Sequence, residues 1–89
     1  MLTVLLLASL RERLGCARLE VPLPSPAPDA QAPTVRELLA DLHTRGNDWA
    51  EALAEGGPWR VAVNQRFARL DQAVADGDEI AFLPPVTGG

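Results

Sequence analysis

One segment near the middle of the chain carries a clear helix signal, and it limits the possible folds more than any other feature. Thr34-Val35-Arg36-Glu37 matches a capping box, in which the threonine hydroxyl and the glutamate carboxylate satisfy free backbone amides at a helix start. The apolar positions that follow have the spacing of one helix face, and Gly46 ends the pattern: Val35, Leu38, Leu39 and Leu42. A stripe of this kind is buried only by packing against another element.

The rest of the chain supplies strands for that helix to cover. Strand-like patterns occupy residues 1–7, 18–23, 59–63, 66–70 and 79–83, with turn signals at Asn64-Gln65 and Asp76-Gly77-Asp78. Short helices are predicted at 8–14, before Gly15, and from Asn47 or Asp48 to Leu53. Five prolines between 22 and 33 predict an extended, solvated connector. The prediction is an α+β fold: a mixed sheet wrapping one main helix, with short extra helices.

Alternation along the strands predicts an exposed apolar patch. Ile80 and Phe82 point to one face of the last strand, whereas Leu83 points to the other. Because one helix covers only one face, Leu7, Phe67 and Leu83 are left outside, and such patches usually mark protein–protein surfaces. The alternative is that loops and a short helix cover these side chains.

Composition excludes several classes of function. The 89 residues predict a single domain (1–89), and the net charge of −4 without a basic run argues against nucleic-acid binding. The apolar run at the start is too short and broken to be a membrane span. Cys16 is the single cysteine, which excludes an internal disulfide and a cysteine-based zinc site and fits the cytoplasm. His43 has no nucleophile to serve, the acidic turn 76–79 lacks the other ligands of a calcium loop, and Gly56-Gly57 is not a phosphate-binding motif. We therefore expect no bound metal or cofactor and no catalytic side chain.

The last six residues suggest chemistry of another kind. Gly88-Gly89 lets an enzyme pocket close around the backbone, and Pro84-Pro85 stiffens the stem, so we expect a flexible extended C-terminal tail at 84–89. It can reach about 20 Å. Its carboxylate is ionised and a poor electrophile, so it must be activated, most simply as an adenylate made from ATP by a partner enzyme. The alternative is a frayed terminus.

These residues resemble a known family. Val63-Asn64-Gln65 and the ending 76–89, DGDEIAFLPPVTGG, look like the small, sulfur-carrier subunit of molybdopterin synthase (the MoaD type). Residues 4–12 resemble that family's first strand and following helix. The likeness covers nearly the whole chain, although the proline-rich connector is longer than the family pattern.

The resemblance implies a ubiquitin-like β-grasp fold and a mechanism. A MoeB-type enzyme adenylates Gly89 with ATP, and a sulfur donor enzyme converts it to a thiocarboxylate. The tail then enters the large, MoaE-type subunit, where sulfur converts cyclic pyranopterin monophosphate (precursor Z) to molybdopterin. By this resemblance Gly89 is the modified residue and Gly88 the slim neighbour that permits entry. The chain is no enzyme on its own; it is the sulfur-donating part of a heterotetramer, with two small subunits at the ends of a large-subunit dimer.

The same resemblance implies a docking surface. Leu7, Phe67 and Leu83 match the family's apolar docking positions, and Arg11 matches a polar contact beside them. The tail residues also match partner-binding positions: Pro84, Pro85, Val86 and Thr87. Three alternatives stay open: a ThiS-type carrier of the thiamine pathway, a ubiquitin-like modifier conjugated to lysines, and a binding module with an inert tail.

Overall fold

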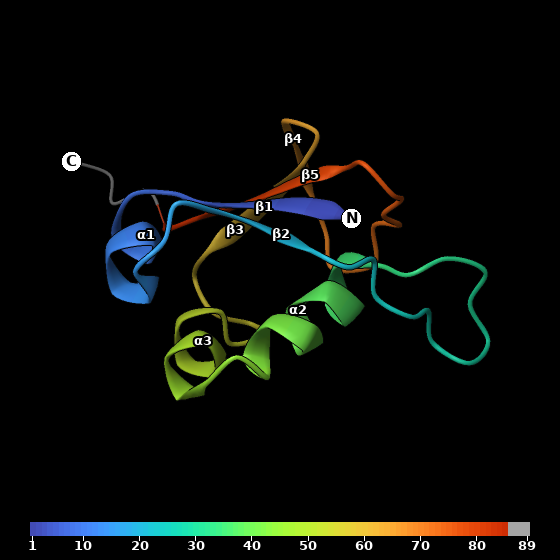
Figure 1. Cartoon of the computed structure of the whole chain (residues 1–89), viewed down its shortest axis with the longest axis horizontal. Coiled ribbons are helices and arrows are strands. Elements are labelled where there is room, and N and C mark those ends of the chain that lie inside the picture. Colours follow the sequence, from blue (N-terminus) through green and yellow to red (C-terminus); the bar gives the residue numbers. More distant parts are fainter. Residues whose placement is uncertain (86–89) are drawn as a thin grey trace.

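The computed structural model describes residues 1–85, and their strands form one mixed sheet (Figure 1). In chain order the elements are β1 (Leu2–Leu6), α1 (Ser9–Leu14), β2 (Arg18–Val21), α2 (Val35–His43), α3 (Asn47–Ala52), β3 (Arg60–Val63), β4 (Arg66–Ala68) and β5 (Glu79–Leu83). The strands lie in the order β2-β1-β5-β3-β4, so the last strand is the middle of the sheet. β1 and β5 run parallel and the other neighbours antiparallel. The predicted α+β fold is confirmed.

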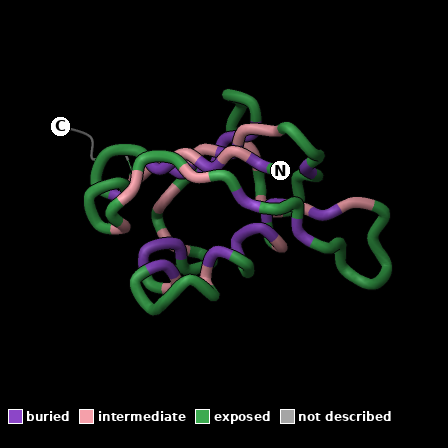
Figure 2. The backbone as a smooth tube through the Cα atoms, viewed as in Figure 1, coloured by how far each residue is buried: buried purple, intermediate pink, exposed green. Residues whose placement is uncertain are grey.

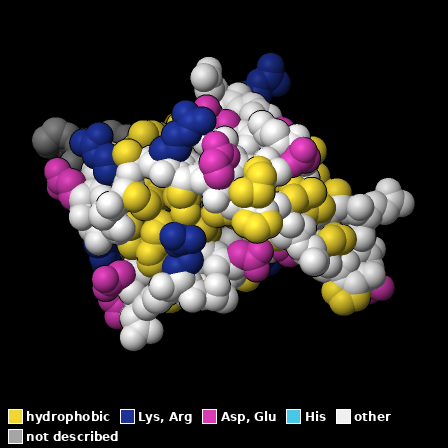
Figure 3. Space-filling model, in the orientation of Figure 1, with side chains coloured by type: hydrophobic (Ala, Val, Ile, Leu, Met, Phe, Trp, Pro, Cys, Tyr) yellow, Lys and Arg dark blue, Asp and Glu magenta, His cyan; other side chains and the backbone are white. Residues whose placement is uncertain are grey.

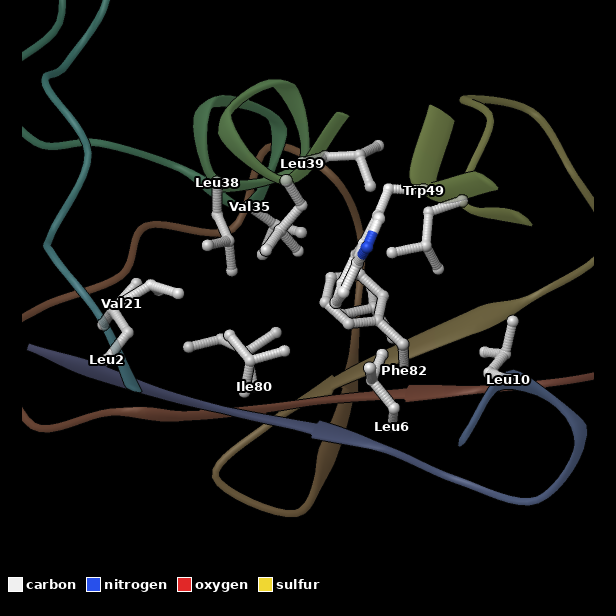
Figure 4. Close-up of a cluster of buried hydrophobic side chains, with 14 of the residues drawn as sticks. Leu2, Leu6, Leu10, Val21, Val35, Leu38, Leu39, Trp49, Ile80 and Phe82 are labelled. Carbon is white, nitrogen blue, oxygen red and sulfur yellow. The ribbon is translucent and has the colours of Figure 1, made fainter. Parts of the chain in front are cut away.

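Helix α2 forms where the capping signal predicts it. The backbone N–H of Thr34 donates to Glu37 Oε1 at 2.8 Å, and the Thr34 hydroxyl lies 2.9 Å from the same oxygen. All four stripe residues of α2 are fully buried. In Figure 4, Val35, Leu38 and Leu39 point toward the labelled side chains of β1 and β5. All four stripe residues belong to one buried cluster with Leu2, Val4, Leu6, Ile80 and Phe82. The core therefore lies between α2 and one face of the sheet, with α3 closing one end (Figures 1 and 2).

Several element boundaries differ from the predictions. Strand β1 ends at Leu6 rather than 7, because Ala8 takes a positive φ of 51° as the chain turns into α1. Strand β2 ends at Val21, before Pro22, which has no amide to donate to the sheet. Strand β4 covers 66–68 rather than 66–70, and β3 begins at Arg60 rather than at 59. Helix α1 begins at Ser9 rather than at 8, and α3 ends at Ala52 rather than at 53.

The end of the main helix was also predicted wrongly. Helix α2 stops at His43 with Thr44 as its C-cap, three residues before the glycine that was expected to end it. Gly46 is instead the N-cap of α3, with a φ of 152° that favours glycine. The prediction that Asn47 or Asp48 caps α3 is therefore wrong by one or two positions. His43 Nε2 lies 2.7 Å from the carbonyl oxygen of Leu53, which joins the ends of the two helices.

The proline-rich connector, residues 22–33, projects from the end of the sheet as an irregular loop, as predicted (Figure 1). Its anchors are the buried Pro24 and Pro33, and the carbonyl of Pro33 accepts a hydrogen bond from Val74 N–H at 2.9 Å. Most of its other residues are exposed (Figure 2). In the described part of the chain, no helix is both long and apolar enough to span a bilayer.

Candidate functional site: an apolar face beside the tail

The face of the sheet turned away from α2, here called the outer face, carries an apolar hollow of about 260 Å³. One row of paired residues crosses four strands there: Leu5 on β1, Ala81 on β5, Ala62 on β3 and Phe67 on β4. The two alanines leave space in the middle of the row, while the larger residues stand around it. The lining residues are Leu5, Leu7, Ala62, Gln65, Phe67, Glu79, Ala81 and Leu83.

The structure brings together the three apolar residues that strand alternation places outside. Leu7 is 38% exposed and Phe67 is 67% exposed, while Leu83 is half-buried, and all three line the hollow. The helices lie on the opposite face or at its end (Figure 1), so they do not cover this surface. The prediction of an exposed apolar patch is confirmed, and the alternative that loops and a helix cover it is wrong.

One polar residue of this face was missed in the sequence. Arg60 pairs in register with Leu83, and its guanidinium carbon lies 5.0 Å from the centre of the Phe67 ring. A cation over an aromatic face is attracted to the ring electrons. The signal was available, because alternation along residues 60–63 places Arg60 and Ala62 opposite the buried Val61 and Val63.

Arg11, the polar contact that the resemblance implies, lies exposed on α1. It is not among the residues that line the hollow. Within residues 1–85 its side chain forms no ion pair. Its role in binding stays a prediction.

The tail begins next to the hollow. Leu83 ends β5 and lines the outer-face hollow, and Pro84 follows directly in the chain. Pro84 and Pro85 line a second hollow of about 320 Å³, between α1 and α3. Arg13 and Glu51 also line it, and they form an ion pair with an N–O distance of 3.3 Å. The predictions for Val86, Thr87, Gly88 and Gly89 lie outside the described residues.

The two motifs that carry the family resemblance meet at one turn. Asn64 has a positive φ of 50°, which asparagine tolerates better than most residues. Its side chain donates to Asp78 Oδ1 at 3.0 Å and accepts from the backbone N–H of Glu79 at 3.0 Å. The other oxygen of Asp78 accepts from Ala75 N–H at 2.9 Å. These polar groups hold the β3–β4 turn against the start of β5, and thus position Phe67.

The chain is similar to known proteins over its whole length. It matches the model of the ThiS family over residues 4–89. It is 42% identical to the molybdopterin synthase sulfur carrier subunit of Escherichia coli and 46% identical to that of Haemophilus influenzae, in both cases over the full length of both chains.

Solved structures show the same fold. The crystal structure of SAMP1 from Haloferax volcanii has a TM-score of 0.72 at 28% identity, covering 99% of this chain and 98% of that one. A complex of subunits 1 and 2 of the molybdopterin-converting factor from Helicobacter pylori matches with a TM-score of 0.63 at 25% identity, covering 99% and 97%. The chain therefore belongs to the ThiS family and has the ubiquitin-like β-grasp fold.

Proposed function

We propose that this chain is the sulfur carrier subunit of a molybdopterin synthase, which holds sulfur as a thiocarboxylate on Gly89. The observation that carries the proposal is that an exposed apolar hollow adjoins the start of the tail, in a chain that matches two such subunits from end to end. The names of those relatives favour molybdopterin over thiamine synthesis, although the family model takes its name from the thiamine carrier.

The proposed chemistry takes place on the terminal carboxylate. A MoeB-type enzyme transfers AMP from ATP to the Gly89 carboxylate, and pyrophosphate leaves. A sulfur donor enzyme then supplies sulfur at the oxidation level of sulfide, which displaces AMP and leaves the thiocarboxylate. In the large subunit this sulfur attacks a side-chain carbon of cyclic pyranopterin monophosphate and displaces an oxygen substituent from it, and water then cleaves the acyl–sulfur bond. A second charged carrier supplies the second sulfur of the dithiolene in the same way. The carrier returns as a carboxylate, ready for another cycle.

The folded body serves this chemistry by binding partners. The one histidine and the one cysteine have structural places, because His43 meets the Leu53 carbonyl and Cys16 packs against the core. We therefore assign activation and sulfur transfer to partner enzymes of the cytoplasm, which also bind the ATP. The outer face receives the MoaE-type large subunit, and the tail from residue 84 reaches about 20 Å into its active site.

The test is intact-mass analysis of the carrier after incubation with ATP, the adenylating enzyme of the same organism and a sulfur source. Wild type should gain the mass of one sulfur in place of one oxygen. Deletion of Gly89 should abolish that gain, whereas the control Asp29→Ala, in the exposed connector, should retain it. A truncated chain that still gained sulfur would refute the assignment to Gly89. Addition of the large subunit and cyclic pyranopterin monophosphate should yield molybdopterin, and failure there would favour the thiamine carrier.

A further inference from the structure

The β3–β4 hairpin and its flanks contain basic but no acidic side chains. Residues 59–70 contain three arginines and no acidic residue, although the chain as a whole has 8 basic against 12 acidic residues. We call these three the arginine rim: Arg60, Arg66 and Arg69. On the face shown in Figure 3, by contrast, acidic and basic side chains are interspersed, and neither sign dominates.

The rim arginines form no ion pairs within residues 1–85. The ion pairs found there involve Arg13, Arg18, Arg36 and the N-terminus, and none involves a rim arginine. All three rim residues are exposed. A nearby carboxylate, Asp78, is already engaged by Asn64 and by the Ala75 amide. Three exposed guanidinium groups are therefore available to an outside partner.

The rim lies on the hairpin that carries the most exposed apolar side chain of the outer face. Phe67 lines the apolar hollow and also two neighbouring hollows, of about 340 and 430 Å³. Arg60 and Arg69 line the first of these neighbours, and Arg66 lines the second. In the strand register Arg60 and Phe67 share the outer face, whereas Arg66 pairs with Val63 and so points to the other side of the edge strand β4. A protein that covers Phe67 and also reaches around this edge of the sheet would meet the arginines.

We propose that the arginine rim recognises carboxylates on the large subunit, at the border of an apolar surface that fits the outer-face hollow. This inference rests on the proposed function. Arginine suits the role, because its planar guanidinium binds a carboxylate through two parallel hydrogen bonds and also stacks on aromatic rings. Aromatic residues and arginines together are also the residues enriched at the energetic centres of interfaces.

The charge distribution explains how the rim would act. The chain has a net charge of −4, so an acidic partner is repelled by most of its surface and attracted by the hairpin. This orients the approach so that the apolar hollow, and with it the start of the tail, faces the partner. A partner without carboxylates would leave three arginines partly desolvated and unpaired, which costs binding free energy and gives specificity.

The test is stopped-flow association of the full chain with the large subunit of the same organism, from low to high salt. The variant Arg66→Gln/Arg69→Gln removes two rim charges and keeps Arg60 on Phe67. The control Arg36→Gln/Arg45→Gln removes two exposed arginines in or next to α2, away from the outer face, so both variants have the same net charge. The rim variant should associate about 10-fold more slowly at low salt, with a flatter salt dependence, while the control changes about 2-fold or less.

The possible outcomes separate the arginine-rim proposal from the proposed function. If the two double variants have equal association rates and equal salt dependence, the proposed role of the arginine rim is wrong. The proposed function would still stand in that case, provided that the chain binds the large subunit. An effect seen with the adenylating enzyme but not with the large subunit would also overturn the role of the rim. If wild type gains sulfur but does not bind the large subunit, the assignment to molybdopterin synthase falls, and the rim proposal with it. Urea midpoints within error of wild type should confirm that all variants fold.

Discussion

The two phenylalanines lie on opposite faces of one sheet, so the same substitution should have very different effects on stability. Phe82 is fully buried and meets the Trp59 ring edge-on, with 5.5 Å between the ring centres, whereas Phe67 is 67% exposed. Phe82→Ala should therefore destabilise the fold by about 3–5 kcal/mol, from lost burial and the cavity it leaves. This is a large share of the roughly 5–13 kcal/mol expected for a domain of this size.

The loss of stability expected for Phe67→Ala, on the outer face, is smaller and can be worked out from the same structure. Full burial of a phenylalanine contributes about 1.5–3 kcal/mol, so the third of Phe67 that is covered contributes about 0.5–1 kcal/mol. Loss of the Arg60 contact adds about 0.5–1 kcal/mol, as for other exposed cation–π pairs. Phe67→Ala should thus cost about 1–2 kcal/mol in total.

Urea unfolding followed by the fluorescence of Trp49 and Trp59 measures both changes. With a urea dependence of about 1.5 kcal/mol per M, the midpoint should fall by about 2–3 M for Phe82→Ala and by about 1 M for Phe67→Ala. Under conditions where both variants are folded, only Phe67→Ala should bind the large subunit more weakly. Equal shifts in the two midpoints would refute the assignment of the two rings to inner and outer faces.

Two further predictions concern docking and the turn beneath it. Leu7 and Leu23 are both 38% exposed, but only Leu7 lines the outer-face hollow. Leu7→Glu should therefore weaken binding of the large subunit about 30-fold, as measured by calorimetry, whereas the control Leu23→Glu should leave binding unchanged. Equal losses would remove the hollow from the interface. Asn64→Gly keeps the positive φ but loses the side-chain hydrogen bonds, and should cost about 1–3 kcal/mol in urea unfolding; Asn64→Ala should cost about 1 kcal/mol more. An alanine variant as stable as the glycine variant would show that backbone strain at this turn is negligible.

Features set by neighbouring residues were predictable from the sequence. The capping box at Thr34 and Glu37 and the apolar stripe behind it depend on spacings within one helix, and the structure confirms both. The apolar patch was predictable for the same reason, because alternation along a strand decides which face each side chain occupies.

Features set by pairing between distant segments were not predictable in this way. The row from Leu5 to Phe67 exists because β5 lies between β1 and β3, and no local pattern specifies that order. The stacking of Arg60 on Phe67 depends on the same pairing. Gly46 was misassigned because a glycine with positive φ can either end one helix or begin the next. The chemistry assigned to Gly88 and Gly89 stays a prediction.

Because β5 is the middle strand of the sheet and leads directly into the tail, the chain can fold only if the segment that carries the tail is intact. Thr3 pairs with Glu79 across almost the whole chain, so the sheet closes only through contacts that are slow to form. Without residues 79–83, the order β2-β1-β5-β3-β4 divides into two strand pairs, and an isolated two-stranded sheet is marginally stable at best. A carrier clipped at β5 would therefore lose its fold together with its tail, and would be removed by proteases rather than occupy the partner as an inert competitor.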